Sequence, residues 1–96
     1  MGLFLYINLI KYLYMIKKFQ VIQYMKPINN FKEVILRGEE HEDLEYAINE
    51  LETIINDIKR NSNWKIINHE STTYNCKYFD STLNKDIMID YYIKTL

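Results

Sequence analysis

One long amphipathic segment, residues 39–60, constrains the fold of this chain more than any other feature. Its aliphatic side chains recur at steps of three and four residues, which is the spacing of one face of an α-helix. Acidic residues crowd its first turns and Lys59 and Arg60 close its last turn, so both ends match the helix dipole. Such a face must be buried, and a sheet is the expected partner. The aliphatic face consists of Leu44, Ala47, Ile48, Leu51, Ile54, Ile55 and Ile58.

Strand-prone segments flank this helix on both sides. Residues 31–37 form the first, with Val34-Ile35-Leu36 as a buried run and Gly38 at its end. Residues 64–69, 72–80 and 87–94 follow the helix. The sequence therefore predicts an α+β domain with the order β-α-β-β-β, in which one helix packs on a mostly antiparallel sheet. A helical crossover also allows residues 31–37 to pair in parallel with a later strand.

The last two strands alternate with a period of two, which is typical of a sheet with one covered face. Asn84 is the expected turn residue in the hairpin loop between them. The predicted covered side carries Tyr74, Cys76, Tyr78, Ile87, Ile89, Tyr91 and Ile93, against Asn75, Lys77, Met88, Asp90, Tyr92 and Lys94 on the other side.

The N-terminal residues predict an appendage to this domain. We expect an apolar helix over residues 3–17 and a possible strand over residues 18–24, so that residues 1–25 are the appendage, 26–30 a linker around Pro27, and 31–96 the compact domain. No run of about 20 apolar residues that would span a membrane is present. The polar residues of this segment do not gather on one helical face, which disfavours a membrane-surface role for residues 1–24 without removing it as an alternative.

Composition excludes several classes of function. A net charge of −1 argues against a basic nucleic-acid-binding face. The single cysteine, Cys76, cannot form an intrachain disulfide and fits a reducing, cytoplasmic location. Isoleucine, asparagine, lysine and tyrosine supply nearly half of the residues and have A/T-rich codons, which indicates a low-GC bacterium, its phage or a mobile element.

The pattern resembles a class of small uncharacterised βαββ proteins of low-GC bacteria and their phages. The resemblance rests on a helix opening at residues 39–45 (EEHEDLE), Ile48-Asn49-Glu50-Leu51 in mid-helix, and a return strand that begins Trp64-Lys65-Ile66-Ile67. It covers residues 31–94. One set of these proteins is associated with sporulation, and another has Gly-Trp where this chain has Asn63-Trp64. The resemblance implies the fold, a tendency to dimerise and no enzyme activity.

Catalytic, cofactor and metal residues are not predicted. His41 lies among acids of a helix that point in different directions, whereas a metal site needs ligands that converge from separated elements. His69 and Cys76 lie on adjacent predicted strands, but a nucleophilic pair also needs an orienting group and an oxyanion hole. The chain has only two glycines, so no phosphate-binding loop is available.

Three binding functions remain. The leading hypothesis is a non-enzymatic homodimer that binds a basic protein partner through the acidic helix face at Glu42, Glu45 and Glu52. A phage or mobile-element inhibitor of a host system is one protein of this kind. The first alternative is a dimer that sequesters a nucleotide-like ligand. The second alternative is peripheral membrane association through residues 1–24. The residues of the nucleotide-like site would be Tyr74, Lys77, Tyr78, Tyr92 and Lys94.

Overall fold

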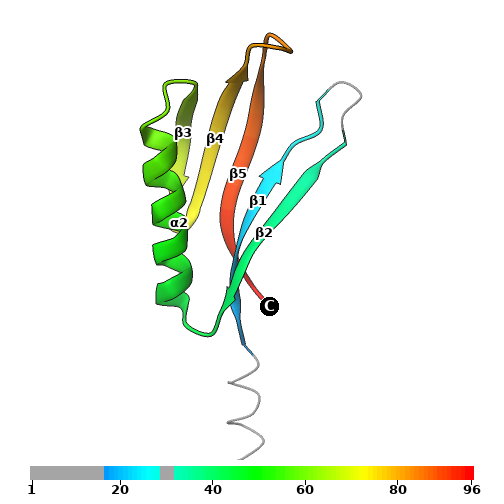
Figure 1. Cartoon of the computed structure of the whole chain (residues 1–96). Coiled ribbons are helices and arrows are strands. Elements are labelled where there is room, and N and C mark those ends of the chain that lie inside the picture. Colours follow the sequence, from blue (N-terminus) through cyan, green and yellow to red (C-terminus); the bar gives the residue numbers. More distant parts are fainter. Residues whose placement is uncertain (1–16, 29–31) are drawn as a thin grey trace, which may run out of the picture.

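A computed structural model describes residues 17–28 and 32–96 and shows one helix packed against a five-stranded sheet (Figure 1). All strand pairs are antiparallel, and the strand order is β2-β1-β5-β4-β3. The predicted α+β architecture is confirmed. In chain order the elements are β1 (Phe19–Met25), β2 (Val34–His41), α2 (Leu44–Lys59), β3 (Trp64–Glu70), β4 (Thr73–Asp80) and β5 (Lys85–Thr95).

Strand β1 is an interior strand of the sheet rather than part of an appendage. It pairs with β2 on one side and with β5 on the other, from Phe19 to Met25 in both cases. The predicted domain boundary at residue 25 therefore falls inside the sheet. The possible strand over residues 18–24 is confirmed, while the helix predicted over residues 3–17 lies almost wholly outside the described residues.

Strand β2 is an edge strand, and the predicted option of a parallel partner for it is wrong. It returns beside β1 after a short connection, so its pairing is antiparallel and local. The helix then crosses the sheet from the β2 edge to the opposite edge, where β3 begins. This crossing explains why two strands adjacent to the helix in sequence lie at opposite edges of the sheet.

Helix α2 begins five residues later than predicted. Residues 39–41 continue strand β2, in which His41 lies opposite Phe19. Asp43 caps the helix, since its Oδ1 accepts a hydrogen bond from the Glu45 N–H at 3.1 Å. The acids before Asp43 suited the helix dipole but belong to the strand and to the turn. At the other end the Arg60 N–H donates to the Asp57 carbonyl and the Asn61 N–H donates to the Ile58 carbonyl.

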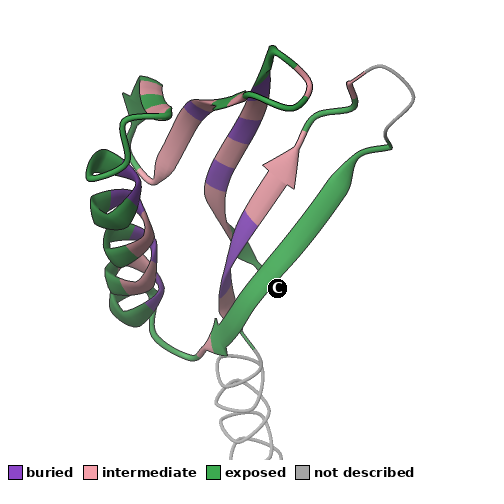
Figure 2. Cartoon of the chain, turned by 45° about the horizontal axis from the view of Figure 1, so that its top comes forward, coloured by how far each residue is buried: buried purple, intermediate pink, exposed green. Residues whose placement is uncertain are grey.

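The core lies between α2 and the sheet face that it covers (Figure 2). The predicted alternation of β4 and β5 is confirmed, and Asn84 has the positive φ of 53° expected of a turn residue. Ile22 is buried outside this cluster, between its cross-strand neighbours Arg37 and Tyr92. The buried cluster consists of Val21, Leu51, Ile55, Ile58, Cys76, Ile87, Ile89 and Tyr91.

Candidate functional site

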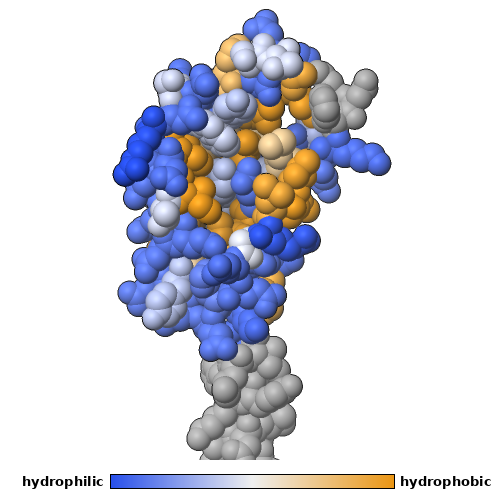
Figure 3. Space-filling view, in the orientation of Figure 1, coloured by the Kyte–Doolittle hydropathy of each residue, from blue (hydrophilic) through white to orange (hydrophobic). Residues whose placement is uncertain are grey.

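An open apolar groove lies on the helix-side face of the sheet (Figure 3). Its smaller part lies between Ile54 of α2 and Leu36 of β2, and its larger part extends from Val34 of β2 across the sheet to Trp64 and Tyr78. It consists of two depressions of about 190 and 560 Å³ that share Gln23. Its origin is geometric. Five strands spaced about 4.8 Å apart make a sheet about 19 Å wide, whereas a helix with its side chains is about 10–12 Å wide. One helix therefore cannot cover the whole face. The apolar lining includes Met25, Ile28, Val34, Leu36, Ile54 and Trp64.

Strand β2 forms the outer wall of this groove. Val34 and Leu36 lie opposite Met25 and Gln23 of β1, which places them on the groove side, while Ile35 lies on the other face. The predicted buried run Val34-Ile35-Leu36 is wrong, because the three side chains are 42, 39 and 53% exposed. A central strand would have buried them on both faces, but β2 is at the edge, and α2 contacts only the other end of this strand, at Glu39 and His41.

The outer backbone edge of β2 is unpaired in the described part of the chain. Among the described residues β2 pairs with β1 alone. Its residues Val34–Arg37 keep a regular register, and the irregularity of this strand pair comes later, between the partners Arg37 and Glu40. A regular, aliphatic, exposed edge is a ready template for strand addition.

The predicted partner-binding acids are exposed but do not all lie on the helix. Glu42 precedes the N-cap, in the turn between β2 and α2, whereas Glu45 and Glu52 lie on α2. Together with Glu40 and Asp43, Glu42 lines a shallow depression of about 760 Å³ beside His41. The negative charge is therefore concentrated at the lower end of β2 as well as along the helix.

The predicted nucleotide-like site is divided between the two faces of the sheet. Tyr74 and Tyr78 pack against the core on the helix side. Lys77, Tyr92 and Lys94 alternate with core residues and lie on the other face. A single ligand cannot contact both groups, so these five residues do not form one site.

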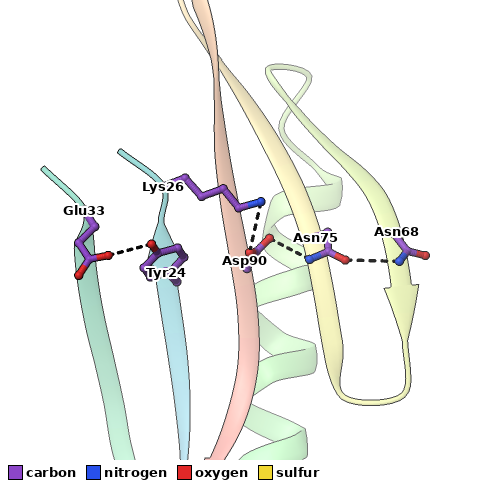
Figure 4. Close-up of polar contacts among 6 residues, drawn as sticks. All are labelled: Tyr24, Lys26, Glu33, Asn68, Asn75 and Asp90. Atoms are coloured by element: carbon purple, nitrogen blue, oxygen red, sulfur yellow. Dashed lines mark hydrogen bonds and ion pairs between the residues drawn. The ribbon is translucent and has the colours of Figure 1, made fainter. Parts of the chain in front are cut away.

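The face away from the helix carries bonded polar side chains in two groups (Figure 4). Tyr24 pairs with Glu33, and a separate row consists of Lys26, Asp90, Asn75 and Asn68. The Tyr24 hydroxyl donates to Glu33 at 2.8 Å, and this bond is the main cause of a raised Tyr24 pKa. Asn75 donates to Asp90 at 2.8 Å and accepts from Asn68 at 3.4 Å. These groups satisfy one another, which explains how the sheet face that α2 does not cover tolerates them.

His69 and Cys76 do not form a nucleophilic pair. The His69 ring stacks on Tyr74 with 3.9 Å between centroids, and its Nε2 contacts the Ser71 carbonyl at 2.9 Å. Cys76 lies opposite Ile66 and is fully buried. Burial is the main cause that raises the pKa of its thiol to about 11, so the reactive thiolate is not populated near neutral pH.

His41 lies in a different environment from the one predicted. It ends strand β2, and its Nε2 lies 3.6 Å from Oε2 of Glu50 on α2. Sequence reasoning missed this contact because it placed both residues on one helix. Asp43 could have indicated this contact, because aspartate favours the N-cap position. A helix that begins after Asp43 places His41 before the helix and not within it.

Comparison of the chain with protein-family models, with curated protein sequences and with solved structures found no match. The class that can be stated is therefore structural: a small α+β protein with one helix on an antiparallel sheet. No helix in the described part of the chain is long and apolar enough to cross a membrane.

Proposed function

We propose that this protein is a non-enzymatic binding protein that takes an extended segment of another polypeptide along strand β2. The observation that carries the proposal is the coincidence of an open strand edge with an apolar groove. Val34 and Leu36 belong to both features. Exposed aliphatic residues gathered in one place are uncommon on proteins without a partner and are typical of interaction surfaces.

The strand edge would contribute affinity that does not depend on the side chains of the bound segment. An added strand forms main-chain hydrogen bonds with the outer N–H and C=O groups of β2, as in other cases of strand addition. Alternate side chains of the added strand, about 6.8 Å apart, would then point toward the groove. The groove would select apolar residues at these positions, because its walls are aliphatic and aromatic.

Charge would set the direction and the composition of the segment. The end of β2 near the helix start is acidic, with Glu40, Glu42 and Asp43 around one depression. A segment with lysine or arginine at that end complements this charge. The expected partner is therefore an extended segment with alternating apolar residues and a basic flank. This proposal keeps a basic partner but moves the main contact from the outer helix face to the β2 edge.

A second copy of the chain is the competing occupant. Two β2 strands that pair antiparallel would place the aliphatic half, Val34–Arg37, opposite the acidic half, Gly38–His41. Acids opposite aliphatic residues are a poor match, which favours a different polypeptide at this edge. Sedimentation of the full chain distinguishes the two occupants, since a dimer that is broken by Leu36→Asp would show that the second copy takes the site.

The test is selection of peptides from a random display library against the full chain. We expect enriched peptides to share apolar residues at every second position and a basic end. Binding should be lost in Leu36→Asp and kept in Ile67→Asp, a matched control since both side chains are 53% exposed and lie on opposite edges. Trp64, the only tryptophan, lines the groove and reports binding through its fluorescence. A library without enrichment, or peptides that bind Leu36→Asp equally well, would show the proposal to be wrong.

Charge reversal separates the two acidic surfaces. Glu42→Lys should weaken binding of the basic-ended peptides, because Glu42 lies in the acidic depression. Glu52→Lys should change it little, because Glu52 lies beside Asn56 and Lys59 along the helix rather than near the groove. A larger loss of peptide affinity from Glu52→Lys than from Glu42→Lys would show that the peptide contacts the outer helix face.

A further inference from the structure

A histidine and two carboxylates meet at the corner where β2 ends and α2 passes above it. Glu39 and His41 come from the end of β2, and Glu50 comes from the middle of α2. One potential ligand atom from each residue lies within 4.8 Å of the other two. Ligands that converge from separated elements are what a metal site requires.

The spacing of two of these atoms does not suit a hydrogen bond. His41 Nε2 and Glu50 Oε2 are 3.6 Å apart, which exceeds the usual range for N–H···O bonds. Both atoms are shielded from solvent, and neither has a hydrogen-bond partner among the described residues. Two ligands at about 2.0–2.1 Å from a tetrahedral Zn²⁺ ion are roughly 3.3 Å apart. The observed separation is thus close to that of two atoms that share one ion.

The backbone around Glu50 holds its carboxylate in this place. Its Oε1 accepts a hydrogen bond from the Glu39 N–H at 3.3 Å, which leaves Oε2 directed at His41. Gly38 makes room for it, because a Cβ at that position would lie 2.7 Å from Glu50 Oε2. Such outer contacts orient ligands in metal sites.

We propose that Glu39, His41 and Glu50 form a site for a divalent cation of the Zn²⁺ class. One imidazole with carboxylates suits zinc and related transition metals, whereas Mg²⁺ and Ca²⁺ prefer oxygen ligands alone. Three protein ligands leave a fourth position for water or for a ligand from outside. The neighbouring acids Glu40, Glu42 and Asp43 raise the local concentration of cations. The zinc proposal does not rest on the proposed peptide binding at β2.

The experiment is a calorimetric titration of the full, untagged, chelator-treated chain with Zn²⁺ alone. We expect one ion per chain and no competition from Mg²⁺. His41→Ala should weaken Zn²⁺ binding about 100-fold, and Glu50→Gln at least about 10-fold. The matched controls are His69→Ala, which removes the other histidine, and Glu52→Gln, which changes an exposed acid of the same helix; both should bind as the parent does.

Circular dichroism shows which variants fold. If His41→Ala does not fold, Gly38→Ala decides, because its added methyl group displaces the Glu50 carboxylate and should weaken Zn²⁺ binding about 10- to 100-fold. Absence of one-to-one binding by the parent chain would overturn the proposal. Equal affinity of the folded His41 or Gly38 variant and of His69→Ala would overturn it as well, and would leave the His41–Glu50 contact as an ion pair.

Discussion

Leu51 and Leu36 face the same side of one sheet and have opposite surroundings. Leu51 of α2 is 2% exposed, in contact with the buried cluster, whereas Leu36 of β2 is 53% exposed at the groove. The difference arises because one helix is narrower than the sheet: α2 packs against β1, β3 and β5 but meets β2 only near its end, so the first half of β2 stays open. The two regions therefore differ in burial: Leu51 belongs to the core of the fold, whereas Leu36 lies on the surface where we propose binding.

The largest expected effect lies in the covered half. Leu51→Ala leaves a cavity among buried residues and should lower the free energy of unfolding by about 2–5 kcal/mol. Urea denaturation, monitored by circular dichroism, measures this loss of free energy. A loss below about 1 kcal/mol would mean that the helix does not pack as tightly as its burial indicates, and the contrast between the halves would fail.

The covered half is also the part that the sequence predicts well. The helix stripe and the alternation of β4 and β5 are periodic patterns, and burial on one face produces them directly. Cys76, Ile89 and Tyr91 were all expected on the covered face and are buried there. Periodicity shows which face of a strand is covered, and these three residues lie where the helix covers that face.

The open half was predicted poorly for three physical reasons. Aliphatic residues occur both in buried strands and in exposed strands at the edge of a sheet, so Val34-Ile35-Leu36 does not show which of these it forms. Glu39 and Glu40 suit the helix dipole and also an exposed strand, which moved the predicted helix start. The approach of His41 to Glu50 depends on a chain reversal at residues 42 and 43 that no periodic pattern records.

The second prediction uses the titration of a core thiol. Burial is the first cause that raises the Cys76 pKa from its usual 9.0 to about 11, so at these pH values the unfolded chain loses the proton before the folded one does. Below pH 9 the thiol is protonated in both states and has no effect. Above pH 9 the free energy of unfolding should fall by up to about 1.4 kcal/mol per pH unit.

Cys76→Ala isolates this effect, because its free energy of unfolding should fall less steeply between pH 9 and 10 than that of the parent chain. Tyr91 adds a further loss at higher pH, since burial raises its pKa to about 12. Comparison of the slopes, rather than of the stabilities, removes the cost of the smaller side chain. Identical slopes would show that Cys76 is accessible to water and that the covered half opens readily.

The third prediction concerns the point where the two halves join. Asp43 caps α2 directly after β2, so Asp43→Ala removes one hydrogen bond to the helix N-terminus and should cost about 1 kcal/mol. Thermal or urea unfolding measures the loss. Glu42→Ala is the control, because Glu42 is adjacent but caps nothing among the described residues, and it should change stability by less than about 0.5 kcal/mol. Equal losses from both variants would indicate that charge, rather than the cap, stabilises this corner.

The smallest expected effect on stability comes from Leu36, and it tests the comparison between Leu36 and Leu51 most directly. Leu36→Ala removes the same atoms as Leu51→Ala, but from a side chain that is mostly in water, so the free energy of unfolding should change by less than about 0.5 kcal/mol. The same urea experiment measures both variants. A loss close to that of Leu51→Ala would mean that the β2 side of the groove is covered in solution, either by another copy or by another part of the chain. A small loss, together with loss of peptide binding in Leu36→Asp, would separate stability from recognition on a single sheet face, because the residue that contributes least to folding would then contribute most to binding.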